Sequence, residues 1–381
     1  MKERLVIKNF GPIESVKLEL GTVNVLIGDQ STGKSTVAKV LSVIKNVVRS
    51  SNIDLTVNGK TGTYEQKMKW FDNEFHKDLE DFGIINYLKT DSYIEFNSSK
   101  NFFKYENQKI LANVTDNEKR DKDSFVISYI PAYRESSNLL SFSLAAIAHA
   151  KAYLPPLFYS FTQELTNAKL AQPLHDYTDI LNVQYKHING NERIVMSNGK
   201  EITFEEASSA INSLIPLLLV FDKAVESNHP TRHRVSHHLN CPYIIIEEPE
   251  LNCFPTTQKK LMDHFISKIK YQTNEGFDYY NNLIITTHSP YILTSLNNLI
   301  YAYKIGQIHN EEADKIIEKK YWVNPGDVSV YMMLANGECE DIFDGEEGLI
   351  KAEKIDGVTN TLNEQFSSLL NLQFAPNEFN T

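Results

Sequence analysis

Short apolar stretches and one amphipathic helix open the chain. Apolar residues run or alternate over 4–7, 16–20 and 23–27, with glycines between them, which predicts three strands. From Val37 to Val48 the apolar side chains recur at three- and four-residue spacing, the period of a helix with one buried face. The start of the chain is therefore expected to fold as strands followed by a helix.

The last third of the chain repeats the alternation of strands and helices. Residues 243–246 form a fully apolar run, and residues 283–286 form another run expected to be a buried strand; both have strand length. Helices are expected over 257–271 and from Tyr291 onwards. Strands without a polar face, alternating with helices, indicate a mostly parallel sheet that is covered on both faces, and hence an α/β fold.

The pattern between these parts is different. Residues 51–124 are rich in Asn, Lys, Tyr and Phe, and they predict an inserted α+β subdomain with a helix over 64–87 and strands at 93–96 and 102–105. A strand returns at 125–130. The insert contains aromatics that either form its core or offer a docking patch: Trp70, Phe71, Phe75, Phe102, Phe103 and Tyr105.

A helical segment and a hairpin follow within residues 136–204. The stretch 136–177 is expected to be mainly helical, with a break at Pro155-Pro156. Asn189-Gly190-Asn191 then marks the turn of a β-hairpin between 185–188 and 193–196.

Composition and charge narrow the possible functions. The net charge of −11 gives no support for binding nucleic acid, although a local basic patch would be compatible with it. The three cysteines have no metal-binding spacing and fit a reducing compartment. No signal peptide precedes the first strand, and the apolar run Leu214–Phe221 is too short to cross a bilayer. We expect a cytoplasmic protein with no membrane contact.

The clearest chemical motif fits GxxxxGK[ST] and lies between an expected buried strand and a helix. Backbone N–H groups of such a loop surround phosphates, the lysine reaches the β- and γ-phosphates, and the hydroxyl after it binds Mg²⁺. The alternative is a chance glycine-rich turn. The predicted nucleotide-binding residues are Gly28, Asp29, Gln30, Ser31, Thr32, Gly33, Lys34, Ser35 and Thr36.

Further polar residues follow the two late strands. Glu247 and Glu248 end the first, where one carboxylate could hold Mg²⁺ or its water and the other could aim the attacking water. His288 ends the second and could bond a γ-phosphate oxygen. The alternatives are acids that mark the end of a strand and a histidine that precedes a helix beginning at Ser289-Pro290.

A weaker signal precedes the apolar helix in the middle of the chain. Residues 206–212 are mostly small or hydroxylated, which suits a phosphate-binding helix start. Plain N-capping by serine, or a capping box between Thr203 and Glu206, explains the same residues equally well.

The order of these motifs resembles that of ABC-type ATPases. The opening Leu5–Ile13, with its Ile-x-Asn-Phe pattern, resembles the RecF/SMC/OLD branch, and the motifs at 247–250 and 287–290 resemble the ATPase half of OLD-family anti-phage defence proteins. The resemblance implies an ABC-ATPase head of the P-loop NTPase class, a mixed sheet covered by helices, formed by residues 1–50 with 125–340. Residues 341–381 are then a C-terminal tail.

The resemblance also implies roles for single residues. Glu247 would hold the Mg²⁺ water, Glu248 would be the catalytic base, His288 the switch histidine, and Asn252 part of the D-loop. Ser208 and Ser209 would bind the γ-phosphate of a partner subunit in a head-to-tail dimer, or a higher homo-oligomer, with ATP at the seam. The sequence departs from the family at Ala210, where Gly is usual, and at Glu247, where Asp is commoner, and no Q-loop glutamine can be assigned.

Three functions stay open at this point. The first is an ATP-driven switch with slow turnover that controls a separate effector, such as a nuclease or toxin, in anti-phage defence. The second is a RecF-like ATPase that binds DNA directly, and the third is an ATP-binding scaffold with little turnover. The tail is expected to be too short for an added nuclease domain, and its acids, which include Asp341 and Asp344, are expected to be a solvated hairpin and not a metal site.

Overall fold

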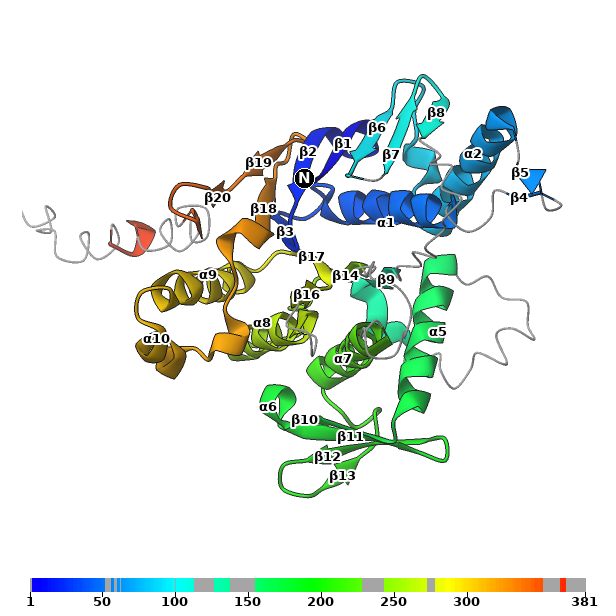
Figure 1. Ribbon diagram of the computed structural model, residues 1–381. Coiled ribbons are helices and arrows are strands. Elements are labelled where there is room, and N and C mark those ends of the chain that lie inside the picture. Colours follow the sequence, from blue (N-terminus) through cyan, green and yellow to red (C-terminus); the bar gives the residue numbers. More distant parts are fainter. Residues whose placement is uncertain are drawn as a thin grey trace, which may run out of the picture.

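The computed structural model describes residues 2–51, 56–57, 60–61, 63–99, 101–112, 127–137, 155–227, 243–272, 278–351 and 364–367. In Figure 1 the chain forms layers, with a central sheet between an upper layer of sheet and helix and a lower layer of helices. A small antiparallel sheet lies below the lower helices. The predicted α/β fold class is therefore confirmed.

The central sheet contains the strands expected from the buried apolar runs. Its described order is β19 (Cys339–Asp341), β18 (Val328–Met333), β3 (Val23–Gly28), β17 (Asn282–Thr287), β14 (Tyr243–Glu247) and β9 (Ile127–Ile130). All neighbours are parallel except β19, which pairs antiparallel with β18. Since β17 lies between β3 and β14, the ends of all three strands meet at one edge.

Each face of this sheet is covered by helices, which explains why its strands carry few polar residues. Val25, Ile246 and Ile285 share one hydrophobic cluster with α7 (Ser209–Ser227), α8 (Pro255–Ile269) and α9 (Pro290–Gly306). Leu26 and Ile245 face the opposite way and pack with α1 (Lys34–Ser51). Successive residues of a strand point to opposite faces, so burial on both faces makes the run continuously apolar.

A second sheet lies above α1. Its order is β2 (Ile13–Leu20), β1 (Glu3–Phe10), β6 (Tyr93–Asn97), β7 (Phe102–Glu106) and β8 (Lys109–Ala112), with antiparallel pairing throughout. The segment predicted as an insert thus adds its strands to the N-terminal hairpin, through β6 and β1. The short strands β4 (Thr56–Val57) and β5 (Lys60–Thr61) precede α2 (Tyr64–Asp81).

The helix that was expected to reach residue 87 ends earlier. Helix α2 starts at a capping box between Thr63 and Gln66 and stops at Asp81, followed by Gly83 at φ +69°. A single 3-10 turn, η1 (Ile85–Tyr87), follows. The chain turns at η1 because Tyr87 packs against the turn between β1 and β2. The backbone carbonyl of Tyr87 accepts a hydrogen bond from Gly11 N in that turn.

Of the two alternatives for the insert aromatics, four residues belong to the core and not to a docking patch. Phe71, Phe75, Phe103 and Tyr105 are 0–2% exposed, and they join the cluster between α2, β7 and α1. The rings of Phe103 and Tyr105 lie 5.2 and 5.3 Å from that of Phe75. They fill the gap between helix and sheet, and Trp70 packs partly buried against the same core.

The lower part of the molecule begins after β9. The elements there are η2 (Ala132–Glu135), α5 (Pro156–Ala171), β10 (Leu174–Tyr177), α6 (Thr178–Leu181), β11 (Val183–Ile188), β12 (Asn191–Met196) and β13 (Glu201–Ile202). The expected hairpin is confirmed, but the helix predicted to run to Tyr177 ends at Ala171. Residues 174–177 instead pair with β11, a tertiary contact that local pattern does not reveal. Positions 138–154 of the predicted helix lie outside the described residues.

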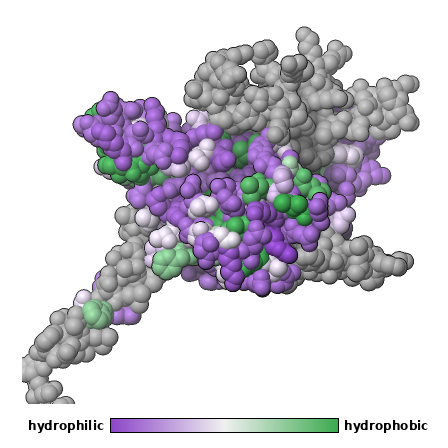
Figure 2. All heavy atoms as spheres, turned by 90° about the horizontal axis from the view of Figure 1, so that it is seen from below, coloured by the Kyte–Doolittle hydropathy of each residue, from purple (hydrophilic) through white to green (hydrophobic). Residues whose placement is uncertain are grey.

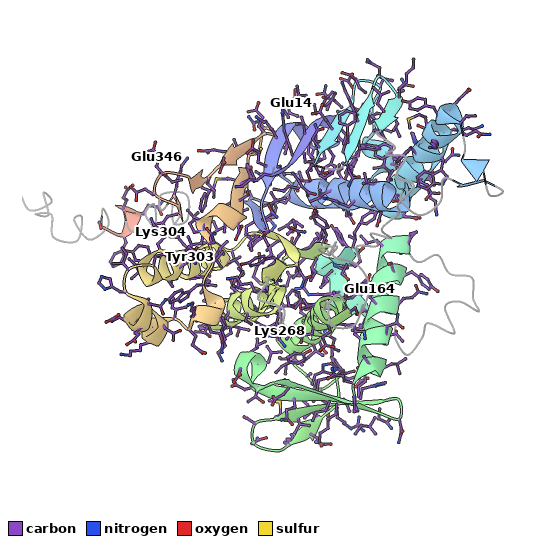
Figure 3. The ribbon with its side chains drawn as sticks, in the orientation of Figure 1. Glu14, Glu164, Lys268, Tyr303, Lys304 and Glu346 are labelled. Carbon is purple, nitrogen blue, oxygen red and sulfur yellow. The ribbon has the colours of Figure 1, made fainter. Side chains whose placement is uncertain are left out.

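The helix α5 is joined to the edge strand β9 by a partly buried polar contact. Ser128 donates a hydrogen bond of 2.7 Å to Glu164, whose place on α5 is labelled in Figure 3. Burial raises the pKa of Glu164 to about 7.

The face seen from below in Figure 2 is mainly hydrophilic, and its hydrophobic side chains form separate small groups.

The remaining elements of the C-terminal third lie outside the central sheet. They are β15 (Lys270–Gln272), β16 (Asp278–Tyr280), α10 (Asn310–Ile316), η4 (Lys319–Tyr321), η5 (Pro325–Asp327), β20 (Phe343–Asp344) and β21 (Leu349–Ile350). The helix expected to reach residue 271 ends at Ile269, where β15 begins. Gly337 turns the chain from β18 to β19, and its carbonyl accepts hydrogen bonds from Glu14 N and Ser15 N. In the part of the chain that is described, no helix has the length and apolar character needed to cross a membrane.

Candidate functional site

The predicted phosphate-binding loop connects β3 to α1, as its sequence motif requires. Gly28 has φ +155°, and a Cβ there would lie 2.4 Å from the Met333 carbonyl oxygen. Gly33 has φ +94°, so both positions need a residue without a side chain. Lys34 is the first residue of α1, which places the loop at a helix N-terminus, where backbone N–H groups and the helix dipole attract anions.

Lys34 lies folded back over this loop. Its Nζ donates hydrogen bonds to the carbonyl oxygens of Gly28 at 2.9 Å and Asp29 at 2.7 Å, and lies 3.4 Å from Nδ1 of His288. Partial burial lowers the pKa of Lys34, against the opposing effect of nearby Glu248 and Glu250. The ammonium group is thus held among acceptors that a phosphate oxygen could replace.

The two glutamates after β14 are placed differently. Glu247 is only 3% exposed, and its carboxylate accepts hydrogen bonds from Tyr129 Oη at 2.7 Å and Ala132 N at 3.1 Å. Glu248 has φ 45°, an unusual conformation for a non-glycine residue, and its carboxylate lies 3.4 Å from His288 Nε2. The left-handed turn of the backbone at Glu248 directs its side chain toward the loop after β17.

Glu250 fixes the backbone around the histidine. One carboxylate oxygen accepts hydrogen bonds from Thr287 Oγ1 at 2.7 Å and from His288 N at 2.6 Å. Ser289 then caps α9 by accepting from Tyr291 N, and Pro290 occupies the first helical turn. His288 therefore directly precedes a capped helix, and its backbone N–H donates to the Glu250 carboxylate.

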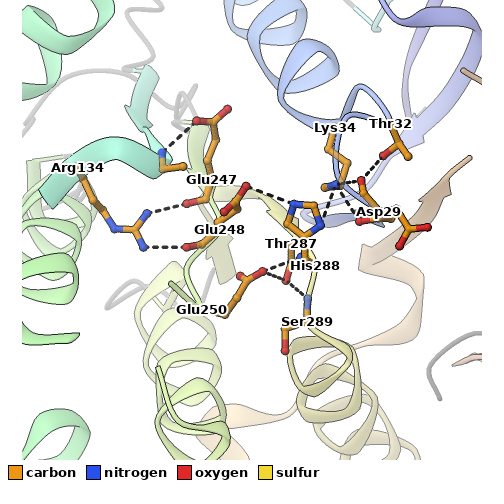
Figure 4. A network of polar contacts seen from close by, with 12 residues as sticks. Asp29, Thr32, Lys34, Arg134, Glu247, Glu248, Glu250, Thr287, His288 and Ser289 are labelled. Atoms are coloured by element: carbon orange, nitrogen blue, oxygen red, sulfur yellow. Dashed lines mark hydrogen bonds and ion pairs between the residues drawn. The ribbon is translucent and has the colours of Figure 1, made fainter. Parts of the chain in front are cut away.

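Figure 4 shows these residues together at the carboxyl edge of the central sheet. Lys34, His288 and Glu248 form a continuous chain of polar contacts across β3, β17 and β14. An ammonium group, an imidazole and a carboxylate beside a phosphate-binding loop are groups that can hold a nucleotide and direct a water molecule at it.

Comparison with known families gives the same result. A family model described as "AAA ATPase domain" matches residues 1–165 and 158–293 of the chain. The chain belongs to the AAA ATPase domain family. The prediction of a P-loop ATPase is thereby confirmed, and this AAA ATPase domain binds and hydrolyses ATP as the family does.

The solved structures that match this chain include SMC heads and the recombination mediator protein RecF. The SMC head domain from Thermotoga maritima is 10% identical, with a TM-score of 0.39 over 90% of this chain and 98% of that one. The recombination mediator protein RecF with bound ATPrS is 11% identical, with a TM-score of 0.38 over 90% and 98% of the two chains. An SmcHead bound to the C-winged helix domain of ScpA is 9% identical, with a TM-score of 0.41 over 91% and 99%. No curated protein matches the sequence.

The other predicted nucleotide contacts in the loop of the AAA ATPase domain differ in their exposure. Asp29, Gln30 and Ser31 at the tip of the loop are exposed, whereas Thr32 and Thr36 are buried. Ser35, the predicted Mg²⁺ ligand, is partly exposed. Thr32 Oγ1 donates to the Asp29 carbonyl at 2.9 Å and so closes the loop on itself.

The predicted signature serines and the D-loop asparagine lie elsewhere. Ser208 and Ser209 are exposed at the start of α7, and Ser208 Oγ accepts from Ile211 N at 3.4 Å. One bond of the alternative capping box is also present, since Thr203 N donates to the Glu206 carboxylate at 2.9 Å. Asn252 is exposed and contacts Glu135. Within the described residues, no hydrogen bond joins these three residues to the phosphate-binding loop of the same chain.

Two residues at this edge were not found from the sequence. Tyr129 is buried in β9, and burial together with the Glu247 carboxylate raises its pKa well above the usual value. Arg134 is 0% exposed and donates to the carbonyl oxygens of Glu247 and Glu248, each at 2.8 Å. A lone arginine just after an apolar strand was the available signal.

The acidic residues of the tail cap turns. Asp341 accepts from Phe343 N, and Asp344 accepts from Glu346 N and Glu347 N. In the described ranges, no group of three or more His, Cys, Asp or Glu residues is arranged to hold a metal ion.

Proposed function

We propose that this protein is a Mg²⁺-dependent ATPase switch whose catalytic centre is the polar chain of Lys34, His288 and Glu248. That chain of contacts carries the proposal, because it brings the groups needed for γ-phosphate binding, water activation and sensing to one edge of the sheet. Lys34 would bind the β- and γ-phosphates, Glu248 would act as general base, and His288 would contact a γ-phosphate oxygen.

The residues at the site also suit Mg²⁺. Protein-bound Mg²⁺ commonly takes one or two oxygen ligands together with substrate phosphates and water. Ser35 offers a hydroxyl in the first turn of α1, and Glu247 offers a buried carboxylate on the face of β14 toward α1. The ion would supply charge neutralisation on the phosphate oxygens when bound. Tyr129 and Ala132 fix the direction of the Glu247 carboxylate.

We propose further that two copies pair head to tail. Ser208, Ser209 and Asn252 are exposed and lie apart from their own phosphate-binding loop, which suits residues that contact the nucleotide of a second copy. Each site would then be complete only in the dimer.

The dimer would control a separate effector protein, in anti-phage defence. The resemblance to OLD-family ATPases motivates this role, and the net charge of −11 favours a protein partner over nucleic acid. Exposed aromatics support protein contacts near the same edge: Tyr133 in η2, Phe254 before α8 and Tyr291 at the start of α9 are 41%, 73% and 51% exposed.

One mass measurement tests the paired state. Glu248→Gln protein with Mg²⁺ and ATP should have the mass of a dimer, whereas the same protein with a second change, Ser209→Glu, should stay monomeric because the added charge repels the γ-phosphate. Ser227→Glu, at the far end of α7, is the matched control and should still dimerise. A monomer in all three samples, at concentrations well above cellular levels, would refute head-to-tail pairing.

A second measurement tests the separate effector. The isolated chain, incubated with plasmid and single-stranded DNA, Mg²⁺ and ATP, should leave both intact, and cleavage should require proteins encoded beside it. DNA cleavage by the chain alone, lost in Asp341→Asn with Asp344→Asn, would contradict the proposal and point to the tail as the active site.

A further inference from the structure

The most deeply buried cation at this edge has no role in the proposed chemistry. Arg134 lies in η2, directly after β9, and none of its surface is exposed. Its guanidinium donates to four backbone carbonyls: Nε to Ser213 at 3.1 Å, one terminal nitrogen to Pro131 at 3.2 Å and Glu247 at 2.8 Å, and the other to Glu248 at 2.8 Å.

Such a group is costly to bury, so its presence calls for a physical reason. Burial lowers the pKa of Arg134 to about 10, which still leaves it charged at neutral pH. Its hydrogen bonds go to carbonyl dipoles, although Glu250, Glu135 and Glu248 are close enough to favour the charge. An apolar side chain would fill the space at lower cost. What arginine adds is a planar fork of five donors that fixes several acceptors relative to one another.

The acceptors belong to three separate segments. Pro131 lies at the end of β9, and Glu247 and Glu248 lie at the end of β14. Ser213 lies in the first turns of α7, the helix that begins at Ser209. Pro216 follows inside the same helix, where a proline removes a backbone donor and disturbs the preceding turn. Arg134 therefore contacts α7 within one turn of this proline.

The neighbouring residue extends the connection. Glu135 accepts a hydrogen bond from Asn252 Nδ2, so the same short turn also holds the loop after Glu250. The turn 131–135 thus contacts the start of α7, both glutamates and the predicted D-loop.

We infer that Arg134 is a positioning residue, which couples the start of α7 to the two glutamates at the end of β14. The inference rests on the proposed function, in which Ser208 and Ser209 meet the nucleotide of a second copy and Glu248 activates water. A displacement of the α7 start on pairing would act on the Ser213 carbonyl, and the rigid guanidinium would carry it to the carbonyl of Glu248. ATP binding by Lys34 uses contacts on β3 and α1 and does not pass through this turn.

Arg134→Lys separates positioning from binding. Lysine keeps the charge, but it presents three donors from a single nitrogen and cannot reach the same four carbonyls. We expect kcat for Mg-ATP hydrolysis to fall about 10- to 100-fold, as misplacement of reacting groups by about 1 Å does. The Kd for the fluorescent nucleotide mant-ATP should stay within about twofold of wild type.

The control is a second buried cation far from these glutamates. Lys45 contacts Glu3 and Tyr243 at the beginning of β14. Lys45→Met, which also removes a buried cation, should leave kcat within about twofold. Glu135→Ala, which removes the acceptor of Asn252 without emptying the core, should lower kcat with unchanged mant-ATP binding, and it tests the turn if Arg134→Lys fails to fold.

The outcomes distinguish the inference from the proposed function. If the wild type hydrolyses ATP and a folded Arg134→Lys protein has a normal kcat, the positioning role alone is refuted. If Arg134→Lys does not fold, a normal kcat in Glu135→Ala refutes it in the same way. Parallel loss of mant-ATP binding and kcat, or the same loss of kcat in Lys45→Met, would also refute it. Absence of hydrolysis by the wild-type protein under dimer-forming conditions would refute the proposed function and the inference together.

Discussion

Removal of the Glu250 carboxylate should loosen the backbone that carries His288. In Glu250→Ala, Thr287 Oγ1 and His288 N both lose the oxygen that accepts their hydrogen bonds at 2.7 and 2.6 Å. Thr287 is 0% exposed, so water cannot easily replace its lost partner, whereas His288 is partly exposed. The change therefore acts on the segment between β17 and α9, on which the histidine lies.

The expected loss of stability follows from these two bonds. A hydrogen bond to a charged acceptor contributes about 1.5–3 kcal/mol, which would give about 3–6 kcal/mol for the pair. Partial replacement by water at His288 reduces the expected loss in free energy of unfolding to about 2–4 kcal/mol. Glu250→Gln keeps a carbonyl oxygen in the same place, so its loss should be only about 1 kcal/mol.

Urea denaturation of the three proteins, followed by fluorescence, measures this difference directly. The rate of ATP hydrolysis at saturating Mg-ATP should fall in the same order, since a displaced His288 no longer faces Lys34 and Glu248. Equal stability in Glu250→Ala and wild type would refute the reasoning. So would a Glu250→Gln protein as unstable as Glu250→Ala, because a neutral acceptor would then have no value at this position.

Two other predictions concern lysines of α1. Lys34→Ala should abolish ATP binding. The rise in melting temperature that Mg-ATP causes in the wild type should then disappear, because a ligand that binds the folded state stabilises that state. An unchanged rise would contradict the assignment of the phosphate-binding loop. Burial lowers the pKa of Lys45 to about 8 in the folded protein, and Glu3 opposes the shift. Between about pH 8 and pH 10, Lys45 is therefore more protonated in the unfolded chain than in the folded protein. The free energy of unfolding should rise with pH over this range. Urea unfolding should therefore show the wild type gaining about 1–3 kcal/mol over Lys45→Met between pH 7.5 and 10, and a decreasing difference would contradict the burial argument.

Much of the site could be predicted because its motifs depend on local order. The GxxxxGK[ST] pattern requires a strand before it and a helix after it, and both were visible as apolar patterns around 23–27 and 37–48. Glu247, Glu248 and His288 each follow a continuous apolar run. Parallel strands end at a common edge, so the runs alone indicated that these residues would lie near one another.

The parts that could not be predicted depend on contacts between distant segments. Residues 174–177 form a strand because they pair with 183–186, and nothing in their own pattern requires it. The pattern of the insert aromatics fitted both a core and a docking patch, and the packing of α2 against β7 and β8 places four of them in the core. Arg134 carries no motif, because its partners are backbone carbonyls, whose positions no side-chain sequence encodes.

Steady-state hydrolysis of Mg-ATP by Glu248→Gln and Glu247→Gln, measured beside the wild type, tests the catalytic centre most directly. A positioned base is worth about 10²–10⁴-fold in rate, so Glu248→Gln should bind mant-ATP normally and hydrolyse ATP slower by about that factor. Glu247→Gln should instead require a higher Mg²⁺ concentration for half-maximal rate. Normal turnover in Glu248→Gln, with the loss confined to Glu247→Gln, would contradict the roles given to the two glutamates.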